Sequence, residues 1–128
     1  MCGSGTLIGT ICIFLIPENS NNLFNIAVQQ AFSPQLQYIE TSKIDTSKVE
    51  DMSSMFEEAR CLTNLNISNW DTSNVVNMES MFCRTTNLTK IDIGKWNMNN
   101  VKNMEFMFFQ SKSIQQLNLS NIKLDYEI

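Results

Sequence analysis

Carboxylates and thiols are the side chains of this sequence that could do chemistry, because the chain contains no histidine. Without histidine, an enzyme would depend on paired carboxylates or on a cysteine–lysine arrangement. Asp45 and Asp71 recur 26 residues apart, but each stands just before a predicted helix. The amides and the dipole of a first helical turn stabilise a carboxylate there, so we expect a structural role and no catalysis.

The four cysteines form no metal motif. They are Cys2, Cys12, Cys61 and Cys83, and no two of them make a Cys-x-x-Cys pair. A structural zinc site would therefore need widely separated ligands, so we expect no metal and no cofactor. A disulfide between Cys61 and Cys83 is possible if adjacent repeats bring them near. Free buried thiols are favoured, because the two cysteines hold different positions in the repeat.

Composition favours one folded domain. Of the 128 residues, 43% are hydrophobic and 17% are charged, which is too hydrophobic for a disordered chain. The net charge is -4 and no basic cluster is present. Nucleic acid is therefore not an expected partner.

The N-terminal part of the chain is predicted to cap the fold. Residues 6–17 form an apolar run that is too short to span a bilayer as a helix, so we expect no transmembrane span. A strand that covers the open end of a repeat stack is favoured. A signal-peptide region is the alternative, although no Lys or Arg precedes it, and Cys2-Gly3-Ser4 is similar to the start of a mature lipoprotein.

A repeat of 26 residues is the strongest pattern in the sequence. Asp45, Asp71 and Asn97 are in register, and the apolar positions after them match. The matching sets are Val49, Val75, Val101; Met52, Met78, Met104; Met55, Met81, Met107; Phe56, Phe82, Phe108; Leu62, Leu88, Ile114; Leu65, Ile91, Leu117; Ile67, Ile93, Leu119; and Trp70, Trp96, Ile122. We predict one structural domain, with a cap and a degenerate first repeat at 1–44 and about three repeats at 45–128, the last incomplete.

Each repeat is predicted to contain a strand and a short helix. Val75, Met78, Met81 and Phe82 are spaced for one face of a helix of about ten residues. Ser47 and Glu50 have the spacing of a capping box, and residues 65–67 alternate as a half-buried strand does. The predicted fold class is an α/β solenoid, leucine-rich-repeat-like, with a parallel sheet on one side.

The repeat string resembles a known family. Its strand half follows the leucine-rich-repeat spacing L-x-x-L-x-L over Leu62–Ile67, and its second half reads W-D-T-S-x-V-x-x-M-x-x-M-F from Trp70 to Phe82. The unit resembles the repeat of BspA-like bacterial surface proteins and the lipoprotein-associated repeat of mycoplasmas, over about 36–122. The resemblance implies a cell-surface or secreted protein that acts in adhesion to host proteins or other cells.

Two polar ladders on the strand face are the candidate binding site. Outward positions of the strand stack between repeats, and their residue types change along each ladder, as suits recognition. The first ladder contains Tyr38, Asn64, Lys90 and Gln116, and the second contains Glu40, Asn66, Asp92 and Asn118. The Met-Phe pairs and the tryptophans are expected to pack in the core. The alternative to binding is an ordinary solvated face on a structural spacer of a larger repeat protein.

Overall fold

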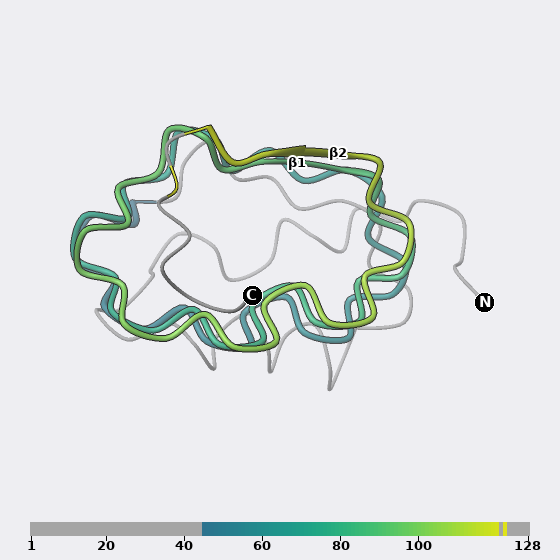
Figure 1. The fold of residues 1–128 in the computed structure, drawn as a ribbon, viewed down its shortest axis with the longest axis horizontal. Helices are drawn as coiled ribbons and strands as arrows, with labels where there is room; N and C mark the ends of the chain where they lie inside the picture. Colours follow the sequence, from purple (N-terminus) through teal and green to yellow (C-terminus); the bar gives the residue numbers. More distant parts are fainter. Residues whose placement is uncertain (1–44, 121, 123–128) are drawn as a thin grey trace.

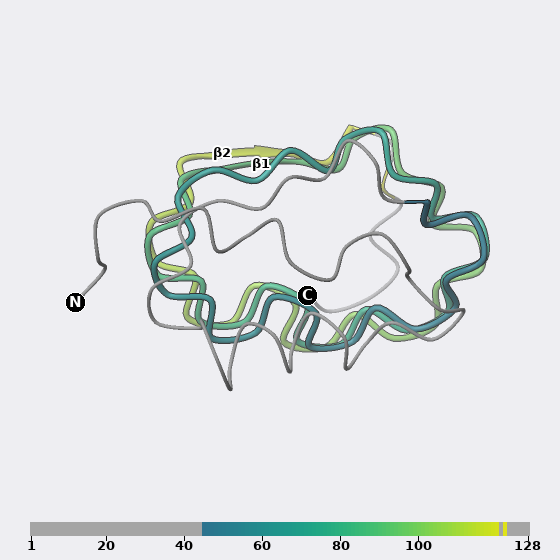
Figure 2. The ribbon, with the colours of Figure 1, turned by 180° about the vertical axis from the view of Figure 1, so that it is seen from behind.

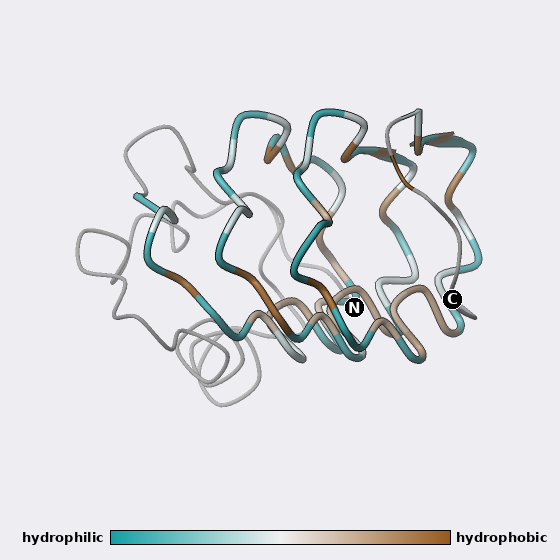
Figure 3. Ribbon diagram, turned by 60° about the vertical axis from the view of Figure 1, so that its left-hand side comes forward, coloured by the Kyte–Doolittle hydropathy of each residue, from teal (hydrophilic) through white to brown (hydrophobic). Residues whose placement is uncertain are grey.

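Three turns of the chain lie side by side with almost the same outline (Figures 1 and 2). The computed structural model describes residues 45–120 and 122. We name these turns coil 1 (residues 45–70), coil 2 (71–96) and coil 3 (97–120 and 122). Hydrophobic stretches occupy corresponding places in successive coils (Figure 3), as the 26-residue repeat requires.

Backbone hydrogen bonds join each coil to the next along one side of the stack. In coil 1, the amides of Met52, Ser54, Phe56 and Glu58 donate to carbonyls of coil 2 at 2.8–2.9 Å. The amides of Met78, Ser80, Phe82 and Arg84 donate to coil 3 in the same way, also at 2.8–2.9 Å. Parallel bridges join Asp51 to Asn77 and Asn77 to Asn103 on this side.

The opposite side carries two short parallel strands. Strand β1 is Lys90–Asp92 and strand β2 is Gln116–Asn118, with Lys90 opposite Gln116 and Asp92 opposite Asn118. They come from the strand half of the repeat and pair with the 26-residue offset. The corresponding segment of coil 1, residues 64–66, forms no pair with β1.

The short helices predicted inside the repeats are absent from coils 1–3. Residues 53–58, 79–84 and 105–110 form consecutive turns instead. Each of these segments holds two residues with positive φ, which interrupts any helix. They are Ser54 and Glu58, Ser80 and Arg84, and Phe106 and Gln110. Alternate amides therefore point to the next coil and not to the carbonyl four residues back.

The predicted capping box is also absent. The hydroxyl and the amide of Ser47 both bond to Oδ1 of Asp45, at 2.7 and 3.0 Å. Asp71 receives the same pair from Ser73 at 2.6 and 3.0 Å. These hydrogen bonds lower the pKa of both carboxyls, and the bond from the serine hydroxyl has a larger effect than the bond from the amide. The Asp-x-Ser string thus forms a local turn and not a helix cap.

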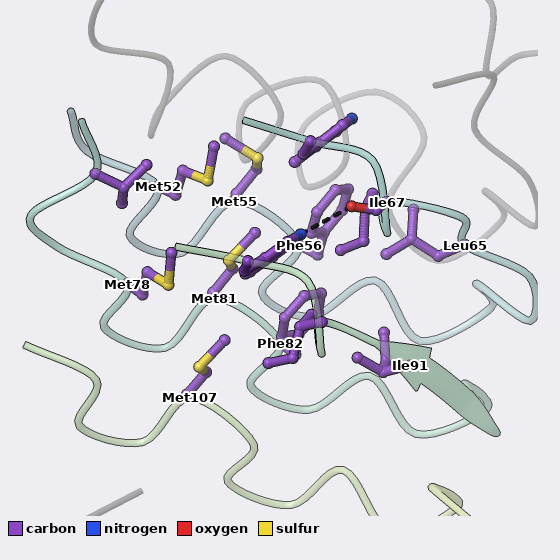
Figure 4. Packing of buried hydrophobic residues seen from close by; sticks show 14 of the residues in the cluster. Met52, Met55, Phe56, Leu65, Ile67, Met78, Met81, Phe82, Ile91 and Met107 are labelled. Atoms are coloured by element: carbon purple, nitrogen blue, oxygen red, sulfur yellow. Dashed lines mark hydrogen bonds between the residues drawn. The ribbon is translucent and has the colours of Figure 1, made fainter. Parts of the chain in front are cut away.

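The apolar positions of the repeat are buried in coils 1 and 2, as predicted, whereas in coil 3 Phe108, Ile114, Leu119 and Ile122 are only partly buried and Leu117 is exposed. Val75, Met78, Met81 and Phe82 are all fully buried. Rings stack between coils: Phe56 lies 5.6 Å from Phe82, which lies 5.4 Å from Phe108, centroid to centroid. Trp70 and Trp96 are nearly parallel at 6.5 Å, and Trp96 Nε1 donates to the Ile67 carbonyl at 2.9 Å. Methionines form similar columns beside the rings (Figure 4).

Side chains at the repeat positions of Asp71 to Asn74 also join the coils. Buried Thr46 and Thr72 each donate from Oγ1 to a carbonyl of the next coil, at 3.0 Å. Asn74 and Asn100 donate from Nδ2 to a carbonyl of the preceding coil, at 2.7 and 2.6 Å. In coil 2, Thr72 and Asn74 therefore provide bonds in both directions along the stack.

Assignment of the whole chain to the leucine-rich-repeat-like class stays a prediction. The N-terminal cap and the degenerate repeat predicted at 1–44 lie outside the described residues. Over the described residues, no helix is long and apolar enough to cross a membrane.

Replacing Thr72 by valine should destabilise the protein by about 1–2 kcal/mol, because the change removes a buried donor and leaves the Asn97 carbonyl without it. Urea unfolding followed by circular dichroism measures the loss. The control is Ser73→Ala, which removes an exposed hydroxyl bond within one coil. Equal losses in the two variants would contradict a special role for the inter-coil bond.

Replacing Gly94 by alanine should cost about 1–3 kcal/mol through overpacking. A Cβ at this position would lie 2.7 Å from Asn118 Oδ1 and 2.7 Å from Ser120 Oγ in the neighbouring coil. The same change in an Asn118→Ala background should cost less, because the clashing amide is gone. Additive losses in this double-mutant cycle, measured by urea unfolding, would contradict the close contact.

Candidate binding surface

The first predicted ladder lies exposed on the strand face. Asn64, Lys90 and Gln116 are all exposed, each from the corresponding position of its coil. Lys90 pairs with Gln116 through the backbone of β1 and β2. Alternation within the strand orients these side chains outward while Leu65 and Ile91 are buried. Tyr38 and Glu40, which begin the two predicted ladders, lie outside the described residues.

The second ladder forms turns, a role that the sequence analysis did not assign to it. Asp92 Oδ1 accepts the Gly94 amide at 3.1 Å, and Asn118 Oδ1 accepts the Ser120 amide at 3.1 Å. Asn66 Oδ1 accepts the Ser68 hydroxyl at 3.0 Å. This role could have been predicted from the sequence, because an Asp or Asn side chain commonly accepts a hydrogen bond from the residue two positions later in a turn.

A concavity of about 320 Å³ lies between coil 1 and β1. Asn64, Asn66, Lys90 and Asp92 line it, together with Thr63, Leu65, Ile67 and Ser68. No backbone hydrogen bond joins residues 63–68 to β1, whereas β2 bonds to the other edge of β1. In Figure 1 the ribbon of coil 1 bends away from β1 at this place. The structure thus brings four of the predicted site residues together in one hollow.

The chemistry of the concavity is that of polar recognition. It combines an ammonium group, a carboxylate, two amides and two hydroxyls, which can donate and accept hydrogen bonds. Its volume is at the lower end of the range for ligand pockets. In the part of the chain that the structure describes, no group of three or more histidine, cysteine, aspartate or glutamate side chains could hold a metal ion.

Gln116 and Asn118 do not line this concavity. They lie on β2, which pairs with β1. The predicted site therefore divides into a part at coils 1 and 2 that lines the concavity and a part on β2 that does not.

A second polar cluster was not predicted from the sequence. It lies on the turn side of the stack, which is formed by residues 53–58, 79–84 and 105–110. Arg84 Nη1 lies 2.6 Å from Glu58 Oε1, and Arg84 Nε donates to Gln110 Oε1 at 3.0 Å. These three residues hold the same repeat position and all have positive φ. Arg60 adds a second contact, 2.8 Å from Glu58 Oε2. The Arg84 hydrogen bond is the main cause that lowers the pKa of Glu58.

The cysteines differ from one another. Cys83 is a free, buried thiol, and burial raises its pKa. This agrees with the expectation of a free thiol at that position. Cys61 is disulfide-bonded, so the expectation of a free thiol is wrong there. Since Cys83 is free, the two do not bond to each other, which fits their different positions in the repeat.

The stability that Glu58 contributes should depend on pH. The pKa of Glu58 is lower in the folded protein than its ordinary value of 4.5. The stability that the Glu58 carboxylate contributes is therefore complete above pH 4.5 and is lost as pH falls through the pKa of the folded protein. Wild type should exceed Glu58→Gln in free energy of unfolding at pH 7. The difference should stay within about 1 kcal/mol, since Arg84 is partly exposed.

Urea unfolding at pH 7 and pH 3 measures this difference. Glu105→Gln is the control, because it removes an exposed carboxylate of coil 3 that forms no ion pair with any described residue. A difference between wild type and Glu58→Gln that persists unchanged at pH 3 would contradict the electrostatic origin.

Comparison with known proteins identifies one family. The family described as "Mycoplasma protein of unknown function, DUF285" matches residues 21–126, which include all three coils and both ladders. No curated protein and no solved structure matches the chain.

Proposed function

This chain belongs to the DUF285 family of mycoplasma proteins of unknown function, and we propose that it binds a protein partner through the strand face of its stacked coils. The proposed role is adhesion or protein–protein binding without catalysis. Acidic net charge argues against nucleic acid as the partner. The family assignment itself names no partner, so the proposal depends on the surface of this chain.

The proposed architecture is a leucine-rich-repeat-like solenoid in which turns replace the helices. It is supported by the parallel pairing of β1 with β2 and by the inter-coil hydrogen bonds that repeat with the sequence period. Stacked repeats present the same position of successive units side by side, which creates an extended surface for binding.

The concavity beside β1 is the observation that carries the proposal. Asn64 and Lys90 of the first ladder meet there with Asp92 and Asn66 of the second. Because Oδ1 of Asn66 and of Asp92 is engaged in turns, we assign recognition chiefly to Asn64 and Lys90, with Gln116 as a flanking contact. A change of residue type from amide to ammonium to amide along this ladder suits a diversified contact.

The proposed location is the cell surface or the outside of the cell. The resemblance to BspA-like surface proteins supports it. The disulfide at Cys61 also supports it, since disulfides persist mainly in oxidising environments.

A structural spacer is the second candidate function, and one observation favours it. The second ladder, which varies between Asn66, Asp92 and Asn118, has a turn-forming role that accounts for the choice of Asn or Asp. A spacer would need the stack and no partner at its strand face, so the same binding experiment separates the two functions.

Replacing Lys90 by serine should weaken binding to a partner by about tenfold or more, as expected for a central contact of an interface. The measurement is binding of the purified full chain to immobilised extracellular-matrix and host-cell proteins by surface plasmon resonance. The control is Lys102→Ser, which removes the same charge from an exposed position away from the concavity. Circular dichroism checks that both variants are folded.

A triple variant at Asn64, Lys90 and Gln116, each changed to serine, should abolish binding while the protein stays folded. Equal loss of binding in Lys90→Ser and Lys102→Ser would indicate that binding depends on the net charge and not on the concavity. Failure of the wild-type chain to bind any protein of the panel would favour the spacer.

A further inference from the structure

Coil 3 lies at one end of the described stack (Figure 3). It carries a row of backbone amides that have no acceptor among the described residues. The amides of Met104, Phe106, Phe108 and Gln110 donate no hydrogen bond within the described part of the chain. They hold the same repeat positions as the amides that join coil 1 to coil 2 and coil 2 to coil 3. The edge of coil 3 therefore repeats the chemistry of an established interface, and no described residue occupies the place of the partner coil.

The interface between coils shows what fits this edge. Each of its four amides meets a carbonyl at 2.8–2.9 Å, and the carbonyls come from alternate residues of the partner coil, such as Asn77, Glu79, Met81 and Cys83. Within residues 104–110 the edge of coil 3 presents donors, and beside this row the Lys102 carbonyl holds the position at which Glu50 and Val76 accept an amide of the next coil. An ordinary β-strand alternates amides and carbonyls along its edge and would satisfy such a row only in part.

Two identical edges cannot satisfy each other either. If two copies of coil 3 met through this row, amides would face amides, and both sets would remain unsatisfied. A symmetric dimer through the turn side is thereby disfavoured. The complement is a coil that presents carbonyls at alternate positions, as the repeat string itself does.

The side chains of coil 3 also expose apolar surface next to this edge. Phe106 is 54% exposed and Phe109 is 46% exposed, and their rings lie edge to face at 5.8 Å. In coils 1 and 2 the position of Phe106 holds Ser54 and Ser80, and the position of Phe109 holds Glu57 and Cys83. Coil 3 thus replaces small or polar residues by aromatic ones.

The core side chains of coil 3 are also more exposed than those at the same repeat positions of coils 1 and 2. Leu117 is 38% exposed, whereas Leu65 and Ile91, at the same repeat position, are 6% and 1% exposed. Phe108 stacks on Phe82 at 5.4 Å and is only partly buried, although Phe56 and Phe82 are fully buried. A further ring on Phe108 would continue the stack.

We propose that the edge of coil 3 binds a repeat coil of the same type from another protein molecule. The partner presents a D-T-S-x-V-x-x-M-x-x-M-F segment, whose alternate carbonyls accept the four amides and whose phenylalanine packs on Phe108. Phe106 and Phe109 cover the flank of that segment. This surface is separate from the strand face, so the inference does not rest on the proposed function.

A peptide with the sequence of residues 45–58 is the probe, because this segment carries the full string and no cysteine. The measurement is fluorescence anisotropy of the labelled peptide titrated with the purified full chain. The expected result is saturable binding, weakened about tenfold or more for a peptide of the same composition in shuffled order. Absence of saturable binding, or equal binding of the shuffled peptide, would overturn the proposal.

A double variant, Phe106→Ser with Phe109→Glu, locates the binding on the chain. It gives coil 3 the residues that coil 1 carries, and Ser54 and Ser80 already adopt the same positive φ as Phe106. The fold should therefore be retained, which circular dichroism and thermal unfolding check. Peptide binding should weaken about tenfold or more.

The matched control is Val76→Ser, which removes an exposed apolar side chain from coil 2, 39% exposed, without changing the edge of coil 3. It should bind the peptide as wild type does. Equal binding by wild type and the folded double variant would overturn the assignment to coil 3. The strand-face variant Lys90→Ser should leave peptide binding unchanged, which keeps this test independent of the adhesion experiment.

Discussion

The backbone hydrogen bonds between coils are the constraint on which the rest of the structure depends. They fix the offset of 26 residues, and this offset alone places Phe56 against Phe82 and Trp70 against Trp96. To point alternate amides at the next coil, each turn segment holds two non-glycine residues at positive φ. Such a residue costs about 1–2 kcal/mol, so the inter-coil bonds and the buried stacks must offset that cost.

The sequence predicts the packing of this protein better than its secondary structure. The buried set at Val75, Met78, Met81 and Phe82 follows from the apolar spacing. A spacing of three and four residues does not distinguish a helix from consecutive turns, because both return a side chain to the same face at those intervals. The Met81 amide bonds to the Met78 carbonyl, three residues back, so the coil has a helix-like period without a helix.

The turn residues explain why local reasoning failed there. Asp71 and Ser73 have the composition of a helix N-cap, but the adjacent Thr72 and Asn74 bond to two different coils. The same four residue types suit caps and turns, since each offers a short polar side chain to nearby backbone groups. Which structure forms depends on contacts 25–27 residues away. A reading of one repeat in isolation does not include those contacts.

The candidate site was predictable in its residues and not in its shape. Period-two alternation places Asn64, Lys90 and Gln116 on one outward row, and they are exposed there. The concavity arises because coil 1 lacks backbone bonds to β1, although its strand half follows the same pattern as those of coils 2 and 3.

The two sides of the stack differ in how freely their side chains can change. On the turn side, Thr72, Asn74 and Arg84 each bond to another coil, so a substitution there alters the stack itself. On the strand face, the side chains of Lys90 and Gln116 make no hydrogen bond with described residues, so their types can vary at little cost in stability. The strand face can therefore vary in sequence while the turn side holds the coils in register.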